Sequence, residues 1–234
     1  QRTVRKFEFM TGFFITGTDT DVGKTIVTLG LMAGLKHKQA SVLGMKPVAS
    51  GCERTKQGLR NEDALKIQSM GSFEAPYEHI NPYAYEPAIA PHIAAAKIGE
   101  TIVLEKIESS CKYLMNQTEH LVVEGVGGWR VPLGGNKDIS DLAKALKFPI
   151  ILVVGLRLGC INHALLSAEA IERDGVQFRG WVANQVEDNY ADQGLTLECL
   201  KEKISVPMLG QIPYMDKPSA EQSALCLDIE GFSN

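Results

Sequence analysis

Residues 13–25 read FFITGTDTDVGKT, an apolar run followed by a turn and the triplet Gly23-Lys24-Thr25. Backbone N–H groups of such a turn, with those at the start of a following helix, form a cradle for phosphate oxygens. The Lys24 ammonium can reach the terminal phosphates of a nucleotide, and the Thr25 hydroxyl can bind Mg²⁺. A lysine in a first helical turn is unfavourable unless an anion lies there, because it faces the positive end of the helix dipole. The run predicts a nucleotide-binding loop.

This loop differs in length from the common pattern. That pattern has glycine five positions before Gly23, where this chain has Thr18, and Gly17 lies one residue further back. We therefore predict a phosphate loop one residue longer than usual. The alternative is an ordinary strand–turn–helix connection that contains Gly-Lys-Thr by chance.

Three other polar residues adjoin predicted elements. Glu124 follows an apolar run and precedes a glycine-rich stretch, so it is either a second Mg²⁺ ligand or an exposed loop glutamate. Asp63 opens a helix, where a favourable interaction with the helix dipole is by itself the better explanation. Lys46 precedes Pro47, which stops regular pairing. Lys46 is either an ordinary surface lysine or a second cation that stabilises the negative charge of a phosphate group in transfer. We expect Lys24 and Lys46 to be exposed in one crevice.

Three more positions have two explanations each. Residues 159–163 start a predicted helix, with Asn162 either as an N-cap alone or as part of a second anion site. Asn184 either offers its amide to a base edge or begins a turn. Pro213 either packs on an adenine or simply ends a strand.

Continuous apolar runs alternate with helical stretches along the chain. Such runs indicate strands covered on both faces, which favours a parallel sheet. The predicted strands are Phe13–Thr16, Val42–Val48, Leu121–Val123, Ile150–Val154, Trp181–Ala183 and Met208–Ile212. The predicted helices are Lys24–Lys38, Glu62–Met70, Leu104–Met115, Ile139–Leu146, Asn162–Arg173 and Leu195–Ile204, the fifth of them stopping before Gly175. Residues 71–91 are interpreted as a long ordered excursion. We predict a single-domain, doubly wound α/β fold with a mostly parallel sheet.

Composition limits the function classes. The 234 residues carry a net charge of −4, which argues against a nucleic-acid surface, and no apolar run approaches a membrane span of about 18 residues. Residues 1–12 lack the apolar region of a secretory signal, and we expect them to be an extension before the domain of residues 13–234, with Met10 a candidate native start. Five cysteines without metal-ligand spacing fit the cytoplasm and no zinc site.

Together these residues resemble the dethiobiotin synthetase family of P-loop NTPases. The motifs that carry the resemblance are GTDTDVGKT (17–25), KPVASG (46–51), NEDA (61–64), PH (91–92), VEGVGGW (123–129), GCINH (159–163), GWVAN (180–184) and LGQIP (209–213). The longer loop is this family's own form. Two departures are Asp21, where many members have glutamate, and Gln185, where aspartate is often found. Beyond Pro213 no acidic residue aligns with the one that contacts ribose in some relatives.

The resemblance implies an ATP- and Mg²⁺-dependent ligase that forms a homodimer. One amine of 7,8-diaminononanoate takes up CO₂ as a carbamate, whose oxygen attacks the ATP γ-phosphate. The other amine then closes a cyclic urea and releases phosphate. Positioning and charge neutralisation would supply most of the rate. No nucleic acid or membrane is implied as a partner.

The resemblance also assigns roles by position. It implies that Asp63 binds metal, against the explanation from the helix dipole alone. It places residues 159–162 at the substrate carboxylate across the dimer interface. The implied catalytic residues are Lys46, Lys24 and Thr20, and the implied metal ligands are Thr25, Asp63 and Glu124. The implied nucleotide-binding residues are Asp21, Val22, Gly23, Lys24, Thr25, Ile26, Glu124, Gly125, Gly127, Asn184, Gln185, Ile212, Pro213 and Tyr214. The implied substrate-binding residues are Ser50, Gly159, Cys160 and Asn162.

Two other classes share such a loop. A cobyrinate-type amide ligase would be expected to carry a glutaminase domain, for which 234 residues leave no room. Partitioning and septum-positioning switch ATPases have an additional lysine early in the phosphate loop, and residues 18–20 contain none. Their membrane or DNA binding often uses a basic patch or an amphipathic tail, whereas residues 225–234 are short and acidic.

Overall fold

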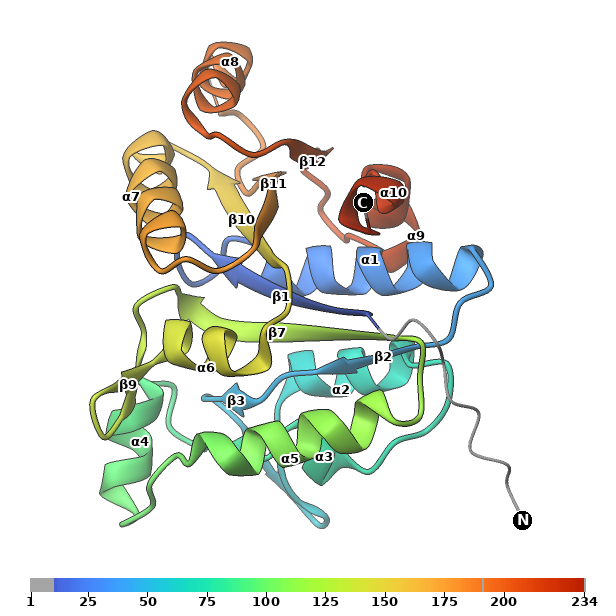
Figure 1. Ribbon diagram of the computed structural model, residues 1–234, viewed down its shortest axis with the longest axis vertical. Coiled ribbons are helices and arrows are strands. Elements are labelled where there is room, and N and C mark those ends of the chain that lie inside the picture. The colour runs from blue at the N-terminus through green and yellow to red at the C-terminus, as the bar shows by residue number, and fades with distance from the viewer. Residues whose placement is uncertain (1–10, 191, 234) are drawn as a thin grey trace.

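The computed structural model describes residues 11–190 and 192–233. Its centre is a six-stranded sheet in the order β12-β11-β10-β1-β7-β2, and every pairing in it is parallel (Figure 1). The strands are β1 (Thr11–Gly17), β2 (Val42–Met45), β7 (His120–Gly128), β10 (Ile150–Leu156), β11 (Phe178–Gln185) and β12 (Met208–Ile212). The parallel, doubly wound α/β fold predicted from the apolar runs is confirmed.

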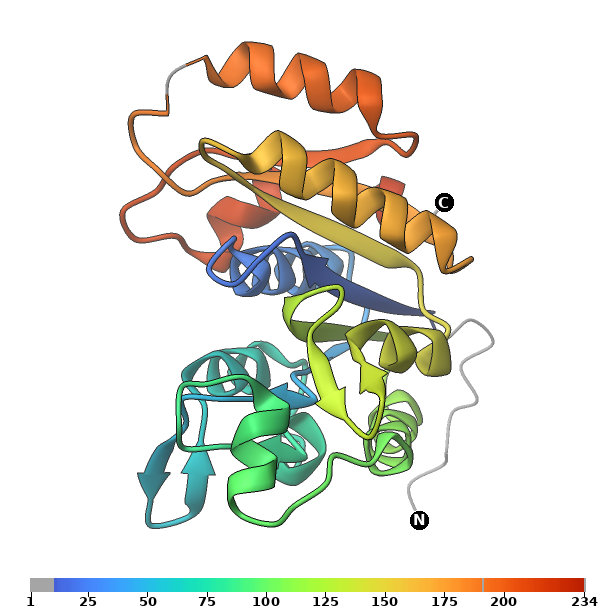
Figure 2. The same ribbon diagram turned by 90° about the vertical axis from the view of Figure 1, so that its left-hand side faces the viewer.

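Helices cover both faces of this sheet. The helices α1 and α2, with α9 and α10 against α1, lie on one face, and α5 to α8 lie on the other (Figures 1 and 2). The helices are α1 (Lys24–His37), α2 (Glu62–Met70), α3 (Tyr77–Ile80), α4 (Pro91–Lys97), α5 (Leu104–Met115), α6 (Ile139–Leu146), α7 (Cys160–Arg173), α8 (Gln193–Lys203), α9 (Ala220–Leu225) and α10 (Ile229–Ser233). In the described ranges none of them has the length and apolar character needed to cross a bilayer.

Burial on both faces explains why the strands are uniformly apolar. All seven residues of β10 are buried, and in β1 only Thr11 is exposed. Trp181 on β11 and Phe14 on β1 are both 0% exposed, so the large side chains of the central strands lie in one continuous core. Removing that much apolar surface from water is the main favourable contribution to folding.

The second strand is shorter than predicted. β2 ends at Met45, and Val48 belongs instead to β3 (Val48–Ala49), which pairs in parallel with β6 (Tyr83–Ala84) outside the main sheet. The break is at Pro47, which has no backbone N–H to donate to a neighbouring strand. Two short antiparallel hairpins were also not predicted: β4 (Glu53–Thr55) with β5 (Gly58–Arg60), and β8 (Pro132–Gly134) with β9 (Lys137–Asp138).

Other boundaries also differ from prediction. β7 continues to Gly128, so Glu124 lies inside this strand instead of following it, and β10 and β11 are also longer than predicted. α1 ends one residue early, and α8 begins two residues earlier and ends one residue earlier than predicted.

β1 begins at Thr11, so residues 11 and 12 belong to the strand; Met10 and the residues before it lie outside the described part. The predicted cap of α7 at Asn162 is wrong. α7 begins at Cys160, with Gly159 as its N-cap at φ 90°, a left-handed backbone that glycine adopts readily, and Asn162 is inside the first turn.

Asp174, which follows the last residue of α7, joins three elements. Its carboxylate accepts hydrogen bonds from Trp129 Nε1 at 2.8 Å, Arg130 at 2.9 Å and Lys144 at 2.9 Å. Partial burial alone would raise the pKa of Asp174, but the hydrogen bonds from Lys144, Arg130 and Trp129 outweigh it and lower the pKa to about 2. The cluster holds the end of α7 against α6 and the segment after β7.

We expect Asp174→Asn to lower the free energy of unfolding by about 1–2 kcal/mol near neutral pH. The folded-state pKa lies below the unfolded one, so this stabilisation is complete above about pH 4 and is lost as the pH falls toward 2. Urea unfolding of both proteins across this range measures it. Glu169→Gln, which removes an exposed ion pair with Arg173 on the same helix, is the control and should have almost no effect. Equal effects of the two substitutions would contradict the assignment.

Candidate active site

The phosphate loop lies between β1 and α1, at the carboxyl edge of the sheet. Gly23 is the N-cap of α1 with φ 92°, and Asp21 also has a left-handed φ of 57°. A Cβ on Gly23 would lie 2.1 Å from Nδ2 of Asn184, so only glycine fits there. The Asn184 amide donates to the carbonyl of Val22 at 3.0 Å, which fixes the loop against β11. The sequence prediction of a strand–loop–helix is confirmed.

Lys24 is the first residue of α1, and its side chain turns back along the loop. Its Nζ donates to the carbonyl of Asp19 at 2.7 Å. Burial, reinforced by the nearby Lys46 charge, lowers the pKa of Lys24 to about 8 despite the opposing effect of Glu124. A buried ammonium that is bonded to a neutral carbonyl is well suited to an incoming anion, since phosphate would restore the favourable interactions lost on burial.

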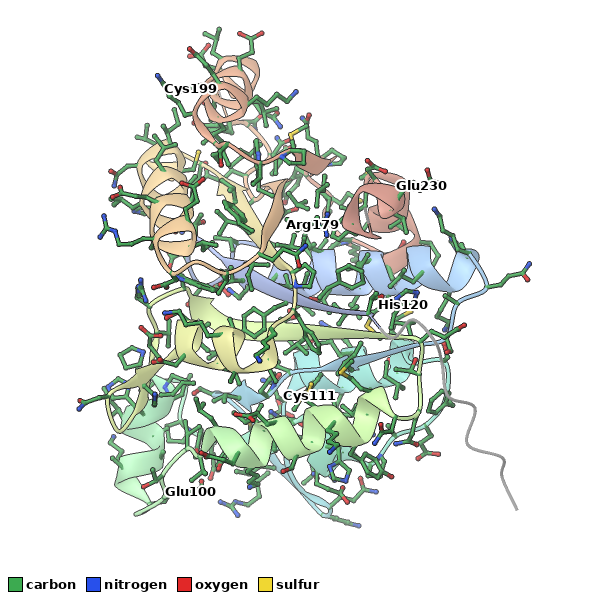
Figure 3. All side chains as sticks on the ribbon, viewed as in Figure 1. Glu100, Cys111, His120, Arg179, Cys199 and Glu230 are labelled. Carbon is green, nitrogen blue, oxygen red and sulfur yellow. The ribbon has the colours of Figure 1, made fainter. Side chains whose placement is uncertain are left out.

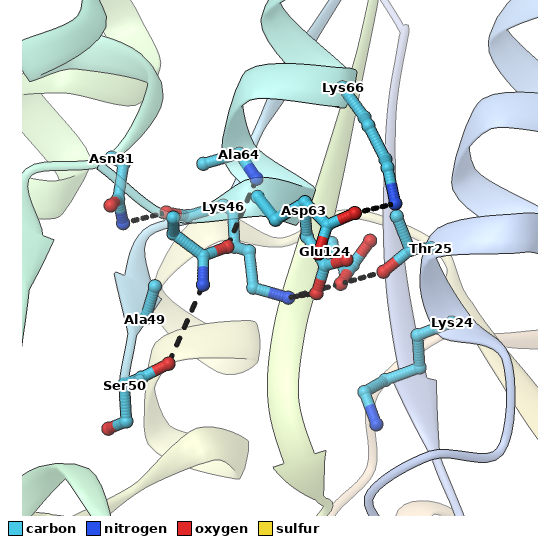
Figure 4. A network of polar contacts seen from close by, with 12 residues as sticks. Lys24, Thr25, Lys46, Ala49, Ser50, Asp63, Ala64, Lys66, Asn81 and Glu124 are labelled. Carbon is cyan, nitrogen blue, oxygen red and sulfur yellow. Dashed lines mark hydrogen bonds and ion pairs between the residues drawn. The ribbon is translucent and has the colours of Figure 1, made fainter. Parts of the chain in front are cut away.

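A second cation lies between two carboxylates. Nζ of Lys46 contacts Oδ2 of Asp63 at 2.9 Å and Oε1 of Glu124 at 2.5 Å, and the Thr25 hydroxyl donates to the same Glu124 oxygen at 2.9 Å (Figure 4). These residues come from α1, α2, β7 and the segment after β2. The four elements meet because they end or begin at one edge of the parallel sheet, the usual ligand position in such folds.

The expected exposure of the two lysines is wrong. Lys24 is 7% exposed and Lys46 is 6% exposed, and Glu124 is 0% exposed. Burial alone would lower the pKa of Lys46, but Glu124 and Asp63 outweigh burial and raise it. Burial alone would raise the pKa of Asp63, and Lys46 lowers it overall. The cluster therefore holds an ammonium in direct contact with two carboxylates, and the burial of Lys46 and Glu124 gives a low dielectric in which electrostatic effects on a reacting group are strong.

The donors at this cluster suit a hard cation. Within residues 11–190 and 192–233 no three carboxylate, histidine or cysteine side chains gather as a metal site, but two carboxylates and the Thr25 hydroxyl do meet. Oε2 of Glu124 is buried without a hydrogen-bond partner in this described part. Mg²⁺ commonly takes one or two carboxylates plus phosphates and water. The residues present therefore fit Mg²⁺.

In the described part of the chain the cysteines do not gather at this cluster, although Cys52 is close enough for the Lys46 charge to act on its thiol. All five are free thiols, and Cys111 on α5 lies far from Cys199 on α8 (Figure 3). Cys52 is buried, and burial raises the pKa of its thiol. Thiolate ligands for a soft metal are therefore not assembled at the predicted site.

A cavity of about 880 Å³ opens beside the cluster. Ser50 also lines it, and the Ser50 hydroxyl has no hydrogen-bond partner among the described residues. The residues predicted from the sequence that line it are Thr20, Asp21, Gly23, Lys24, Thr25, Ile26, Lys46, Ser50, Asp63, Glu124 and Gly127.

Other predicted residues lie outside the lining of this cavity. Val22 and Asn184 are bonded to each other at the back of the loop, and Gly125 lies within β7. Gln185 accepts a hydrogen bond from the Tyr214 N–H at 3.3 Å, beside the paired ends of β11 and β12. Ile212 is the buried end of β12, and Pro213 follows it exposed. Gly159, Cys160 and Asn162 form the start of α7, where Cys160 is buried and Asn162 is exposed.

Part of the cavity wall was not predicted from the sequence. Residues 88–91 and the side chains of Val126 and Val131 supply an apolar side, and residues 218–220 with Ser223 form another. A signal for the second group was present in Ser219 and Gln222, whose spacing is that of a capping box, and the structure has that box at the start of α9.

The fold also occurs in solved structures of distant sequence. A ParA family ATPase from Chlorobium tepidum TLS matches with a TM-score of 0.54 at 13% identity, covering 94% of this chain and 90% of that one. The MinC:MinD cell division protein complex of Aquifex aeolicus matches with a TM-score of 0.57 at 16% identity, covering 92% and 85%. At such identities the similarity establishes the fold alone.

Other proteins have a much higher sequence identity to this chain than these solved structures do. A family profile described as an AAA domain matches residues 11–222. Proteins named ATP-dependent dethiobiotin synthetase BioD are 46% identical over 217 residues in Cellvibrio japonicus, covering 93% of this chain and 95% of the relative, and 47% identical over 212 residues in Xanthomonas oryzae pv. oryzae, covering 91% and 94%. The Pseudomonas aeruginosa protein of the same name is 46% identical over 221 residues, covering 94% and 97%. With the phosphate loop and the buried charge cluster both in place, this chain belongs to the ATP-dependent dethiobiotin synthetase family.

Proposed function

We propose that this chain converts 7,8-diaminononanoate, CO₂ and ATP into dethiobiotin, ADP and phosphate, a step of biotin biosynthesis. The observation that carries the proposal is that Lys24, Lys46, Asp63 and Glu124 line one cavity beside the phosphate loop, with Lys46 bonded to both carboxylates. The loop accounts for ATP, and the family accounts for ligase chemistry. Dissolved substrates require neither a membrane nor a nucleic acid, and we place the reaction in the cytoplasm.

The chemistry balances in three steps. An amine adds to CO₂ and loses a proton, which gives a carbamate. A carbamate oxygen then attacks the γ-phosphorus of ATP and ADP leaves, so that the carbamate becomes a phosphoric anhydride. The second amine attacks the carbamate carbon and loses a proton, and phosphate departs with the bridging oxygen, which closes the cyclic urea.

The residues of the cluster would act through charge and position. Lys24 would leave the Asp19 carbonyl for the β- and γ-phosphates, and Lys46 would face the carbamate and the phosphoryl group in transfer. Thr20 would lie beside the reacting groups, and the unpartnered Ser50 hydroxyl would bind the substrate. Mg²⁺ held by Thr25, Asp63 and Glu124 would neutralise charge on the phosphates.

The remaining predicted contacts lie at two separate ends of strands. Asn184, with Gln185 and residues 212–214, would border the adenine, since Asn184 already touches the phosphate loop. The start of α7 would bind the carboxylate of a substrate whose amines lie in the site of a second copy of the chain. Its first N–H groups are available for this because no side chain caps them. We therefore propose a homodimer whose sites combine both chains.

Mixing two inactive variants tests this arrangement. Lys24→Ala removes the ammonium group that would bind the ATP phosphates, and Asn162→Trp blocks the start of α7. In each mixed dimer one site would have both halves intact, so random exchange should restore about a quarter of the wild-type activity. Lys24→Ala mixed with Lys46→Ala is the matched control, since every site then lacks one of the two lysines beside the phosphate loop and should remain nearly inactive. No recovery in the first mixture, with subunit exchange confirmed by a tag, would mean that each chain has a complete site.

The assigned activity is tested by phosphate release with and without diaminononanoate and bicarbonate. We expect release that depends on both, together with a cyclic urea in the mass spectrum. Phosphate release that does not depend on the diamine would instead favour a switch ATPase.

A further inference from the structure

Lys46 lies where its main chain has left the sheet. β2 ends one residue before it, and the next residue is Pro47. The segment from α3 to β6 replaces the missing strand partners. The Lys46 N–H donates to the Ile80 carbonyl at 2.8 Å, and the Lys46 carbonyl accepts from Asn81 Nδ2 at 2.7 Å. The backbone that carries the Lys46 ammonium is thus held by residues 80 and 81.

Asn81 is in turn held by a tyrosine hydroxyl. The Tyr77 hydroxyl accepts from the Asn61 N–H at 2.8 Å and donates to Asn81 Oδ1 at 3.1 Å. Each direction follows from the groups available: a backbone N–H can only donate, so the hydroxyl proton is left for Oδ1. The Asn81 amide is therefore turned with its NH₂ toward the Lys46 carbonyl.

The same hydroxyl reaches the helix that carries Asp63. Asn61 is the N-cap of α2, and its Oδ1 accepts from the Ala64 N–H at 3.1 Å. Its Nδ2 donates to the Ser50 carbonyl at 3.5 Å. Tyr77, Asn81 and Asn61 are 9%, 4% and 8% exposed, so water competes little for these bonds. One buried chain of directed bonds joins the supports of Lys46, Ser50 and Asp63 (Figure 4 shows the Asn81 and Ser50 contacts).

We propose that Tyr77 and Asn81 are positioning residues of the ligase site, which set the Lys46 ammonium relative to α2 and its Asp63. This inference rests on the proposed function. Neither side chain lines the cavity, so their effect must pass through the residues they hold. Misplacement of a catalytic group by about 1 Å can cost about 100-fold in rate, which makes such supports measurable in turnover.

Tyr77→Phe removes the hydroxyl and keeps the ring, on which the Arg60 guanidinium lies 4.1 Å from the centroid. We expect kcat to fall by about 10-fold or more while KM for ATP stays within about twofold, because the phosphate loop is not part of the network. Tyr83→Phe is the matched control. Its hydroxyl also accepts from a backbone N–H, that of Val103 at 2.9 Å, and Tyr83 is 3% exposed. We expect kcat of this control within about twofold of wild type.

A second variant breaks the network at its bond to Lys46 without burying a charge. Asn81→Leu has about the same volume but cannot donate to the Lys46 carbonyl, and we expect the same kcat loss as for Tyr77→Phe. All rates are measured on protein shown to be folded by circular dichroism at the assay temperature.

A double-mutant cycle shows whether Tyr77 acts through Lys46. In a Lys46→Ala background, Tyr77→Phe should lower kcat by less than about twofold, because the group that it positions is gone. If Tyr77→Phe lowers kcat in that background by the same factor as in wild type, Tyr77 does not act through Lys46 and its role is structural. Equal kcat values for Tyr77→Phe, Tyr83→Phe and wild type would refute the positioning role. In that case dethiobiotin formation by the wild-type enzyme would still support the proposed function. Wild-type protein that forms no dethiobiotin would instead refute the function.

Discussion

Lys24→Ala and Lys46→Ala should each lower kcat by about 100-fold or more. Both ammonium groups lie beside the phosphate loop, and negative charge moves onto the transferring phosphoryl group and the leaving ADP during the reaction. Removing one preorganised charge from such a site costs about 3 kcal/mol of transition-state stabilisation.

The two substitutions should differ in their effect on folding. Lys24 is bonded to a carbonyl, and burial disfavours its charge, so Lys24→Ala should change the free energy of unfolding little. Lys46 neutralises Glu124 and Asp63, and Lys46→Ala leaves Glu124 buried without its cation, which should cost about 3–5 kcal/mol.

Steady-state kinetics and urea unfolding of each variant measure these effects, with Lys201→Ala on the exposed side of α8 as the control. Near-native turnover of folded Lys46→Ala would show that its assigned role is wrong. Equal stability losses for the two site variants would contradict the account of the charge cluster.

Removal of divalent cations should abolish activity. The donors at the cluster are the carboxylates of Asp63 and Glu124 and the hydroxyl of Thr25, a set of oxygen ligands that favours Mg²⁺ or Mn²⁺ over zinc. Turnover in excess EDTA should fall to background and return when Mg²⁺ or Mn²⁺ is added.

The ligand assignment has its own test. Glu124→Gln keeps the shape of the side chain but removes its charge, so it should raise the Mg²⁺ concentration needed for half-maximal activity by about 10-fold or more. Glu62→Gln, whose exposed partner is Lys66 on the same helix, is the control. Recovery of the EDTA-treated enzyme by Zn²⁺ alone would contradict the assignment.

The parts of the fold that follow local rules could be predicted from the sequence. The bounds of α2, α5 and α6 match prediction, as do those of β12, because each begins or ends at a clear change of pattern. The phosphate loop was identifiable because Gly23 and Lys24 have a backbone and charge requirement that few other contexts share.

The parts that depend on packing could not be predicted. Exposure of Lys24 and Lys46 was misjudged because lysine is usually at the surface, and only the folded sheet edge brings Glu124 and Asp63 to them. Tyr77 and Asn81 lie in a stretch without periodicity, where local sequence gives no sign of a contact with residue 46 or 61. The cap of α7 was misplaced because Asn162 is a common cap type, while Gly159 meets the backbone requirement.

The most direct test of the central claim follows an oxygen atom. If the carbamate oxygen attacks ATP, oxygen-18 supplied in CO₂ must enter the released phosphate, one atom for each cyclic urea formed. The measurement is mass spectrometry of both products after a brief incubation of the wild-type enzyme with ATP, Mg²⁺, diaminononanoate and labelled CO₂. We expect singly labelled phosphate in step with dethiobiotin; phosphate without the label, with dethiobiotin forming or not, would contradict the proposed reaction.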